Sequence, residues 1–150
     1  MNADVDPEPR IPRVKRLSPR VLVAEDDAQM RRLVADVLLK EGYDVEELSD
    51  GKELLLRVVE AFLPHHPHSG IDVVVTDMRM PFCSGLDVLK KLRVAHRATP
   101  VLVMTAFGEE GLRRRVQDLG GLLLDKPFTP VALRAAVRLL FEGLTSSAPP

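Results

Sequence analysis

The stretch IDVVVTDMRMPFCSG, residues 71–85, joins an apolar strand to an acid that such a strand rarely tolerates. Val73, Val74 and Val75 form a continuous apolar run of the kind found in a protein core, and Asp77 follows after a single threonine. A carboxylate at the edge of a low-dielectric core costs several kcal/mol unless another group pairs with it. Asp77 is therefore either a structural cap at a turn or a group that the protein uses chemically.

The segments on both sides of this stretch alternate between strand and helix patterns. Apolar or alternating runs predict strands at residues 21–25, 43–48, 71–76, 99–105 and 121–125. Apolar positions at helical spacing predict helices from Met30 to Gly42 and at residues 51–63, 85–94, 108–119 and 130–143. This alternation predicts an α/β fold with a five-stranded parallel sheet, doubly wound, with helices on both faces. Continuous apolar strands favour burial of the sheet on both sides.

The composition is typical of a soluble intracellular domain. The chain has 150 residues, a formal net charge of −1 and one cysteine, which excludes an internal disulfide framework. No apolar run approaches the roughly 20 residues that cross a bilayer, so we expect a cytoplasmic protein. We expect a flexible arm at residues 1–19, a folded domain at 20–144 and a disordered tail at 145–150. Few residues follow the last predicted helix, so no DNA-binding output module is expected.

Polar residues lie at or directly after the carboxyl ends of four of the predicted strands. They are Glu25, Asp26, Asp77, Thr105 and Lys126. The carboxyl ends of parallel strands meet at the edge of the sheet where such folds bind ligands, so we expect these side chains to converge. Clustered acids repel one another, and Mg²⁺ resolves that conflict because it prefers oxygen ligands and needs only one or two carboxylates. The set fits phosphoryl transfer, with Asp77 as a carboxylate nucleophile.

Four motifs in this order resemble the receiver domains of two-component response regulators. They are VLVAEDDAQMRRLV, VVVTDMRMPFCSGLDVLKKLR, VLVMTA and DKPF, and the resemblance covers about residues 20–144. It implies a flavodoxin-like sheet with strand order 2-1-3-4-5. It also implies that Asp77 accepts a phosphoryl group, that Thr105 is the switch hydroxyl and that Lys126 pairs with the phosphate. The implied Mg²⁺ ligands are the side chains of Glu25, Asp26 and Asp77 and the backbone carbonyl of Arg79. The peptide between Lys126 and Pro127 is expected to be cis.

The resemblance also implies partners. The phosphoryl group would come from a sensor histidine kinase or a phosphotransfer protein, and a protein effector would bind the last two helices and the fifth strand. We expect no membrane partner and no nucleic-acid partner. The protein would not be a turnover enzyme, although it would catalyse its own phosphorylation and a slow dephosphorylation.

Two residues depart from the usual receiver pattern. Glu25 stands where the family more often has aspartate, and Leu123 stands where an aromatic residue usually partners the switch threonine. Leucine has no ring to rotate, so the aromatic part of the switch is missing. Phe107 and Arg79 lie two residues after Thr105 and Asp77, respectively. We hypothesise that these two bulky side chains hinder the water that would hydrolyse the acyl phosphate.

Other functions and other residues have plainer interpretations. A receiver that serves only as a docking surface is an alternative that Leu123 favours. An aspartyl phosphatase is disfavoured because Arg79 occupies the place of the second acid, and a dinucleotide-binding enzyme is disfavoured because no glycine-rich turn follows the first strand. We interpret Asp27 as a helix cap and Cys83 as an inert thiol. The loop histidines are interpreted as solvated: His65, His66 and His68. The basic part of the arm is interpreted as a solvated tail, and the run Arg113-Arg114-Arg115 fits a polar face and a partner surface equally well.

Overall fold

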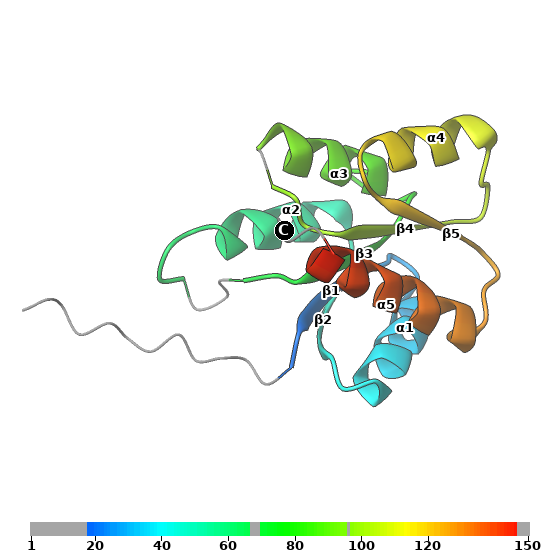
Figure 1. The fold of residues 1–150 in the computed structure, drawn as a ribbon, viewed down its shortest axis with the longest axis horizontal. Coiled ribbons are helices and arrows are strands. Elements are labelled where there is room, and N and C mark those ends of the chain that lie inside the picture. The colour runs from blue at the N-terminus through cyan, green and yellow to red at the C-terminus, as the bar shows by residue number, and fades with distance from the viewer. Residues whose placement is uncertain (1–17, 67–69, 96, 147–150) are drawn as a thin grey trace, which may run out of the picture.

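The computed structural model describes residues 18–66, 70–95 and 97–146, and of residues 144–146 only the backbone. The strands in these ranges form one parallel sheet in the order β2-β1-β3-β4-β5, with helices between successive strands (Figure 1). The strands are β1 (Arg20–Ala24), β2 (Asp44–Leu48), β3 (Val73–Asp77), β4 (Val101–Thr105) and β5 (Leu122–Asp125). The helices are α1 (Ala28–Lys40), α2 (Gly51–Ala61), α3 (Gly85–Val94), α4 (Glu110–Asp118) and α5 (Pro130–Ser146). The predicted α/β fold and its strand order are confirmed.

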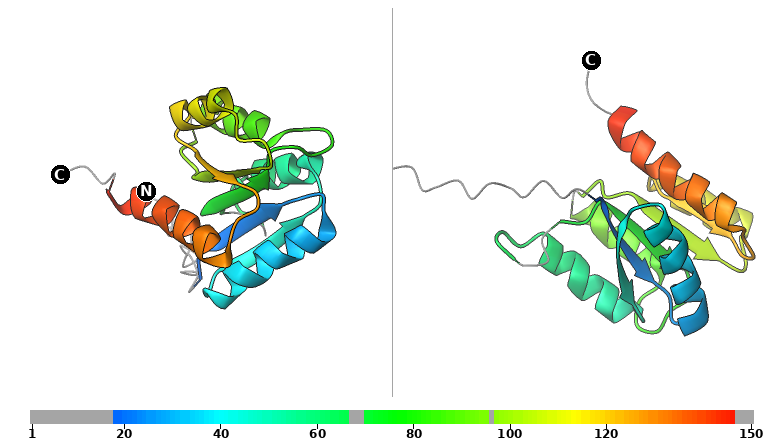
Figure 2. Two further views of the ribbon diagram at one scale, coloured as in Figure 1. Left: turned by 90° about the vertical axis from the view of Figure 1, so that its right-hand side faces the viewer. Right: turned by 90° about the horizontal axis from the view of Figure 1, so that it is seen from below.

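The sheet separates two apolar clusters, one on each face. Helices α2, α3 and α4 cover one face, and α1 and α5 cover the other (Figure 2). Every residue of β3 and β4 is buried, because both strands lie inside the sheet and have helices on either side. Strand β2 lies at an edge and is only partly buried, which agrees with its alternating sequence. Burial of these apolar strands on both faces stabilises the sheet and fixes its carboxyl edge.

Several element boundaries differ from the sequence prediction. Asp77 is the last residue of β3 rather than the first residue after it, and Glu25 follows β1 instead of ending it. Helix α4 begins at Glu110, two residues later than predicted, because residues 108 and 109 belong to the preceding loop. Helix α5 continues to Ser146, three residues beyond the predicted end. Residues 1–17 and 147–150, on which the predictions of an arm and a tail largely rest, lie outside the described residues.

The turns at the carboxyl edge are built from helix caps and one close backbone approach. Asp27 caps α1 by accepting a hydrogen bond from the Met30 backbone N–H at 2.9 Å, as predicted. Ser84 caps α3 in a capping box with Asp87. A Cβ atom at Gly85 would lie only 2.7 Å from the backbone oxygen of Asp77, so glycine permits α3 to start directly against the end of β3. These features position the loop after β1 and the loop after β3.

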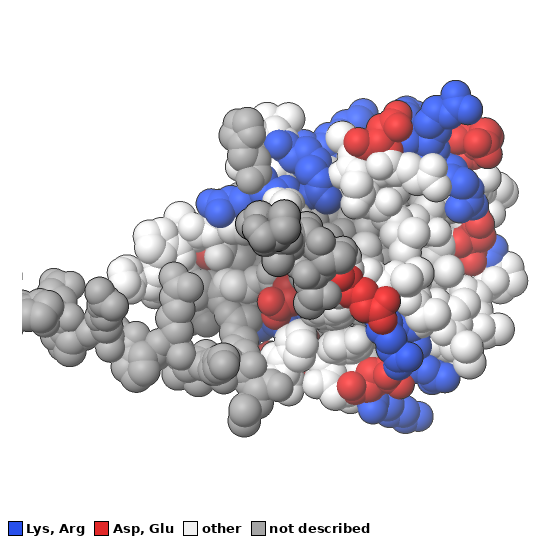
Figure 3. Space-filling view, viewed as in Figure 1, with Lys and Arg blue, Asp and Glu red and all other residues white. Residues whose placement is uncertain are grey.

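The surface of the described part mixes both signs of charge with a few apolar side chains. On the face in Figure 3, basic and acidic side chains lie next to one another at the α4 end of the molecule. The exposed apolar side chains include Phe82 and Phe107, at 81% and 62% exposure, in the loops after β3 and β4. None of the helices in the described ranges combines the length and the apolar character that a membrane crossing requires.

Candidate phosphoryl-transfer site

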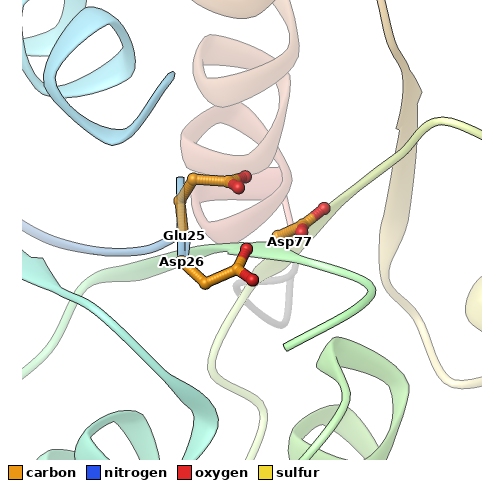
Figure 4. Close-up of side chains that lie close together, drawn as sticks. All are labelled: Glu25, Asp26 and Asp77. Carbon is orange, nitrogen blue, oxygen red and sulfur yellow. The ribbon is translucent and has the colours of Figure 1, made fainter. Parts of the chain in front are cut away.

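The ends of β1 and β3 bring three carboxyl groups together. The two strands pair directly in the sheet, with Ala24 opposite Thr76, so the residues that follow these positions share one rim. The side chains of Glu25, Asp26 and Asp77 each contribute one oxygen to a group whose members all lie within 4.8 Å of one another. Figure 4 shows the carboxyl groups of Glu25 and Asp26 directed toward the side on which Asp77 lies. Glu25 and Asp77 are buried, and Asp26 is exposed.

Lys126 reaches this cluster from the end of β5, the edge strand that lies two strands away from β3 in the sheet. Its Nζ lies 2.9 Å from Oε2 of Glu25 and 3.1 Å from Oδ1 of Asp77. The lysine follows β5, and its backbone N–H donates a hydrogen bond to the Thr105 backbone oxygen at 2.7 Å. The Lys126–Pro127 peptide is cis, as the resemblance implied. The structure therefore brings Lys126 into contact with an acid, Glu25, that lies 101 residues earlier in the chain.

Thr105 ends β4 on the same rim and is 3% exposed. Its neighbour Met104 is paired with Asp77 in the sheet, so Thr105 lies one residue beyond the last pair of β3 and β4. Its Oγ1 accepts a hydrogen bond from the Phe107 backbone N–H at 3.2 Å. The hydroxyl is thus attached to the loop between β4 and α4, and a movement of Thr105 would pull on that loop.

Burial and charge act in opposite directions on the ionisable groups of this site. Burial raises the pKa of Glu25 and of Asp77, and the hydrogen bond from Lys126 opposes that rise. The negative charge of a neighbouring acid, Asp77 for Glu25 and Asp26 for Asp77, raises each pKa further. Burial alone would lower the pKa of Lys126, but its hydrogen bonds to Glu25 and Asp77 outweigh burial, and the net shift is upward. The lysine stays charged, and it alone does not balance three carboxylates.

The donor set fits a hard divalent cation. All three groups are carboxylates, and burial raises the pKa of Glu25 and of Asp77, with a smaller rise from a neighbouring acid in each case. Mg²⁺ binds oxygen ligands of this type and keeps several of its waters, which phosphate oxygens can replace. The residues present therefore suit Mg²⁺ better than zinc, which takes nitrogen and sulfur ligands in most structural sites.

The raised pKa of Asp77 leads to a prediction for the protein without Mg²⁺. A carboxyl group whose pKa is higher in the folded protein makes the free energy of unfolding fall as pH rises through that pKa. At pH 7 the ionised group is a net cost, so Asp77→Asn is expected to raise the free energy of unfolding by on the order of 1 kcal/mol and the melting temperature by about 2–5 °C. Thermal unfolding in EDTA measures the change. A melting temperature below that of the wild type would contradict this electrostatic description.

Leu123, Arg79 and Phe107 have defined surroundings in the structure. Leu123 is 7% exposed and packs in the apolar cluster between the sheet and α2–α4, so its side chain is part of the core. The guanidinium carbon of Arg79 lies 5.1 Å from the ring centroid of Phe107, which joins the loops after β3 and β4 on the surface. Neither this contact nor its distance follows from the sequence, because it depends on the conformation of two loops.

Sequence reasoning missed two groups of contacts around the site. Arg31 donates a hydrogen bond from Nη1 to the backbone oxygen of Glu25 at 2.8 Å and thereby supports the turn that carries the acids. Arg113 of α4 bonds to Asp125 at the end of β5, next to Lys126. Arg31 follows Glu25 by six residues, which places it in the first turns of α1 behind the Asp27 cap. This spacing alone does not predict that the arginine contacts the Glu25 backbone.

The sequence predicts an inert cysteine and solvated loop histidines. Cys83 is 6% exposed, and burial raises the pKa of its thiol, which keeps it in the unreactive protonated form. His65 is exposed and adopts a positive φ of 62° in the loop after α2, and His68 lies outside the described residues. Among the residues that the structure describes, the acidic group at the carboxyl edge includes no cysteine and no histidine.

Comparison with known proteins agrees with this fold. Residues 21–138 match the family model of the response regulator receiver domain. The chain belongs to this family, whose members act as signalling switches in two-component systems. Solved receiver domains share the fold: the Francisella response regulator 1452 receiver domain is 29% identical with a TM-score of 0.74, covering 85% of this chain and 99% of that one. The chemotaxis response regulator CheY4 of Vibrio cholerae is 27% identical with a TM-score of 0.69, covering 82% and 98%.

Curated relatives are of two lengths. The transcriptional regulatory protein PdtaR of Mycobacterium tuberculosis is 38% identical over 122 residues, which cover 80% of this chain and 55% of that protein. The sporulation initiation phosphotransferase F of Bacillus subtilis is 29% identical over 123 residues, which cover 81% and 93%. The chain thus spans about half the length of several curated relatives that it matches.

Proposed function

We propose that this protein is a phosphoryl-accepting switch of a cytoplasmic two-component phosphorelay, in which Asp77 receives the phosphoryl group with the help of Mg²⁺. The observation that carries the proposal is the position of the Lys126 ammonium, 3.1 Å from Asp77 and 2.9 Å from Glu25, in a group of three acids. A structural cap would not need a half-buried lysine and two further acids. The family membership supports the same role.

The chemistry assigns a separate task to each residue. An oxygen of the Asp77 carboxylate attacks the phosphorus of a phosphohistidine, the new O–P bond forms, and the P–N bond breaks with its electron pair going to the imidazole nitrogen, which then takes a proton. Glu25, Asp26, Asp77 and the Arg79 backbone carbonyl would hold Mg²⁺. The bound ion supplies positive charge to the oxygens of the transferring group. Lys126 supplies a second positive charge to the same oxygens.

The product of this step biases the surface around α4. An aspartyl phosphate carries additional negative charge and acceptor oxygens, and the Thr105 hydroxyl can turn toward them. Its hydrogen bond to the Phe107 backbone would then draw in the loop before α4. The proposed donor is a sensor histidine kinase or a phosphotransfer protein, and the proposed effector binds α4, β5 and α5. The relative named as a phosphotransferase supports onward transfer as a further output.

Mg²⁺ is expected to stabilise the folded wild-type protein. A ligand that binds only the folded state raises the free energy of unfolding by about 1.4 kcal/mol at about ten times its Kd. Asp26→Asn removes one carboxylate and should weaken or abolish this gain. The measurement is the melting temperature over a MgCl₂ titration, with NaCl of matched ionic strength as the control. An equal rise in NaCl, or an unchanged rise in Asp26→Asn, would show that the acids do not hold the cation.

The stacked side chains of Arg79 and Phe107 are expected to slow hydrolysis of the acyl phosphate. They join the two loops that flank the site, so removing either one should give water more access to the phosphorus. Phe107→Ala and Arg79→Ala should each accelerate dephosphorylation by on the order of fivefold, about 1 kcal/mol of barrier. The loss of acyl phosphate is followed by mass spectrometry after the donor is removed. If neither substitution accelerates it, the shielding hypothesis fails.

Incubation with Mg²⁺ and a small phosphodonor tests the proposed function. Acetyl phosphate or phosphoramidate should add one phosphoryl group to the intact mass, and EDTA should prevent the gain. No gain with either donor would favour a receiver fold that acts only as a docking surface. Sustained release of inorganic phosphate from small phosphoesters would favour a phosphatase, which the absence of an acid at Arg79 argues against.

A further inference from the structure

The loop between β4 and α4 is fastened to the end of β5 by a contact of three residues, Gly108, Arg113 and Asp125, which we call the clasp. Nη2 of Arg113 in the first turns of α4 lies 2.5 Å from Oδ2 of Asp125. A Cβ atom at Gly108 would lie 1.9 Å from Oδ1 of the same aspartate and 3.4 Å from Arg113 Nη2. The Asp125 carboxylate is thus packed directly against the Gly108 backbone, and any larger residue at 108 would displace it.

Both chain segments that form the clasp, the loop after β4 and the end of β5, are adjacent to residues of the site. Asp125 immediately precedes Lys126, whose ammonium contacts Asp77. Asp125 also pairs with Thr105 in the sheet, and Lys126 donates its backbone N–H to the Thr105 oxygen at 2.7 Å. Gly108 follows Phe107, whose backbone N–H donates to the Thr105 hydroxyl. A displacement of either Thr105 or Lys126 therefore changes the geometry of the clasp within one to three residues.

The usual coupling residue is missing on the same strand. Leu123 lies in the apolar core and offers neither a ring that can turn outward nor a hydroxyl. The sheet pairs Leu123 with Val103, and two residues further along β4 and β5 the corresponding pair is Thr105 and Asp125. A polar connection from the site to α4 is therefore available at Asp125 and absent at Leu123.

We propose that the clasp couples the phosphorylation state of Asp77 to the position of α4 in this protein. This inference rests on the proposed function, because it needs a phosphoryl group at Asp77. Movement of Thr105 and Lys126 toward that group shifts Gly108 and Asp125 relative to each other, and Arg113 carries the shift into α4. In this proposal the segment from residue 105 to Arg113 has one position without the phosphoryl group and another with it. The site holds one end of the segment and the ion pair holds the other.

The clasp is expected to matter for coupling more than for stability. Arg113 and Asp125 are 33% and 53% exposed in their side chains, and ion pairs that exposed contribute little to the free energy of unfolding. Their loss should therefore leave the fold and the site intact. The coupling, in contrast, depends on the geometry of the pair, because no other ion pair in the described residues joins α4 to β5.

The test compares matched substitutions in the full chain by amide NMR. Beryllofluoride with Mg²⁺ serves as a stable mimic of the phosphoryl group, and shifts are followed at Thr105 and Lys126 in the site and at Leu112 and Val116 in α4. Arg113→Gln and Asp125→Asn should keep the site shifts and reduce the α4 shifts by about 2- to 5-fold. Gly108→Ala should give the same loss, because its Cβ displaces the Asp125 carboxylate.

Two controls share the helix and the residue types. Arg114→Gln removes an exposed arginine next to Arg113, and Gly111→Ala adds a Cβ that meets no atom within 4 Å. Both should respond as the wild type does, and Arg113→Lys should retain part of the α4 response because it keeps the positive charge. If the site shifts in the wild type while α4 does not, or if α4 shifts equally in all variants, the clasp proposal is overturned. If beryllofluoride does not shift the amide signals of Thr105 and Lys126, the result contradicts the proposed function itself rather than the clasp alone.

Discussion

Asp77→Asn is expected to abolish phosphoryl acceptance completely. The amide that replaces the carboxylate is a poor nucleophile and carries no charge to hold Mg²⁺, so no acyl phosphate can form at this position. The remaining acids do not replace it: Glu25 is turned toward Lys126 and the Asp27 backbone N–H through its two oxygens. Intact mass after incubation with phosphoramidate and Mg²⁺ should show no added phosphoryl group.

The matched control for this loss is Asp118→Asn. Asp118 is an exposed aspartate at the end of α4, away from the acidic group, and its replacement should leave acceptance unchanged. The melting temperature of Asp77→Asn shows whether the variant has lost phosphorylation only because it is unfolded. Without Mg²⁺, the variant is expected to be at least as stable as the wild type. A folded Asp77→Asn protein that still gains one phosphoryl group would refute the assignment of the acceptor.

Lys126→Met should slow phosphorylation by small donors about 100-fold, which corresponds to about 2.7 kcal/mol of transition-state stabilisation. The ammonium lies 3.1 Å from the Asp77 oxygen and the lysine side chain is only 17% exposed, so its attraction for the incoming phosphoryl oxygens is only weakly screened. Methionine keeps much of the volume and the apolar stem while it removes the charge. The rate is measured as mass gain over time at saturating Mg²⁺.

Lysine at an exposed position provides the comparison. Lys90→Met, on the solvent side of α3, should leave the rate unchanged. Because Lys126→Met removes positive charge from beside the acids, it should retain the Mg²⁺-dependent rise in melting temperature even though transfer is slow. Loss of both the rate and the Mg²⁺ effect would point to a collapsed pocket rather than to a missing charge. An unchanged rate would remove the lysine from the mechanism.

The fold and the acidic rim could be predicted because they follow from pattern and topology. Continuous apolar runs at β3 and β4 identify strands buried on both faces, and parallel strands direct their carboxyl ends to one edge. These two facts are sufficient to bring Glu25, Asp77 and Lys126 to the same rim, where the structure gives contacts of 2.9 Å and 3.1 Å between them. Distance along the sequence does not matter for such residues.

Other features could not be predicted, because they depend on loop conformation and on side-chain reach. The stacking of Arg79 on Phe107 and the packing of Asp125 against Gly108 each join two loops whose backbones no periodic pattern describes. The start of α4 was placed two residues early because Glu109, its cap position, makes no side-chain capping hydrogen bond that marks the boundary.

Localisation of the phosphoryl group tests the central claim most directly. The wild-type protein is phosphorylated with phosphoramidate and Mg²⁺, the acyl phosphate is trapped by borohydride reduction, and peptides are sequenced by tandem mass spectrometry. The proposed function requires the reduced residue to be Asp77, with no modification when EDTA is present. Modification at another carboxylate, or equal modification in EDTA, would contradict the claim that the acids and Lys126 form one cation-dependent acceptor site.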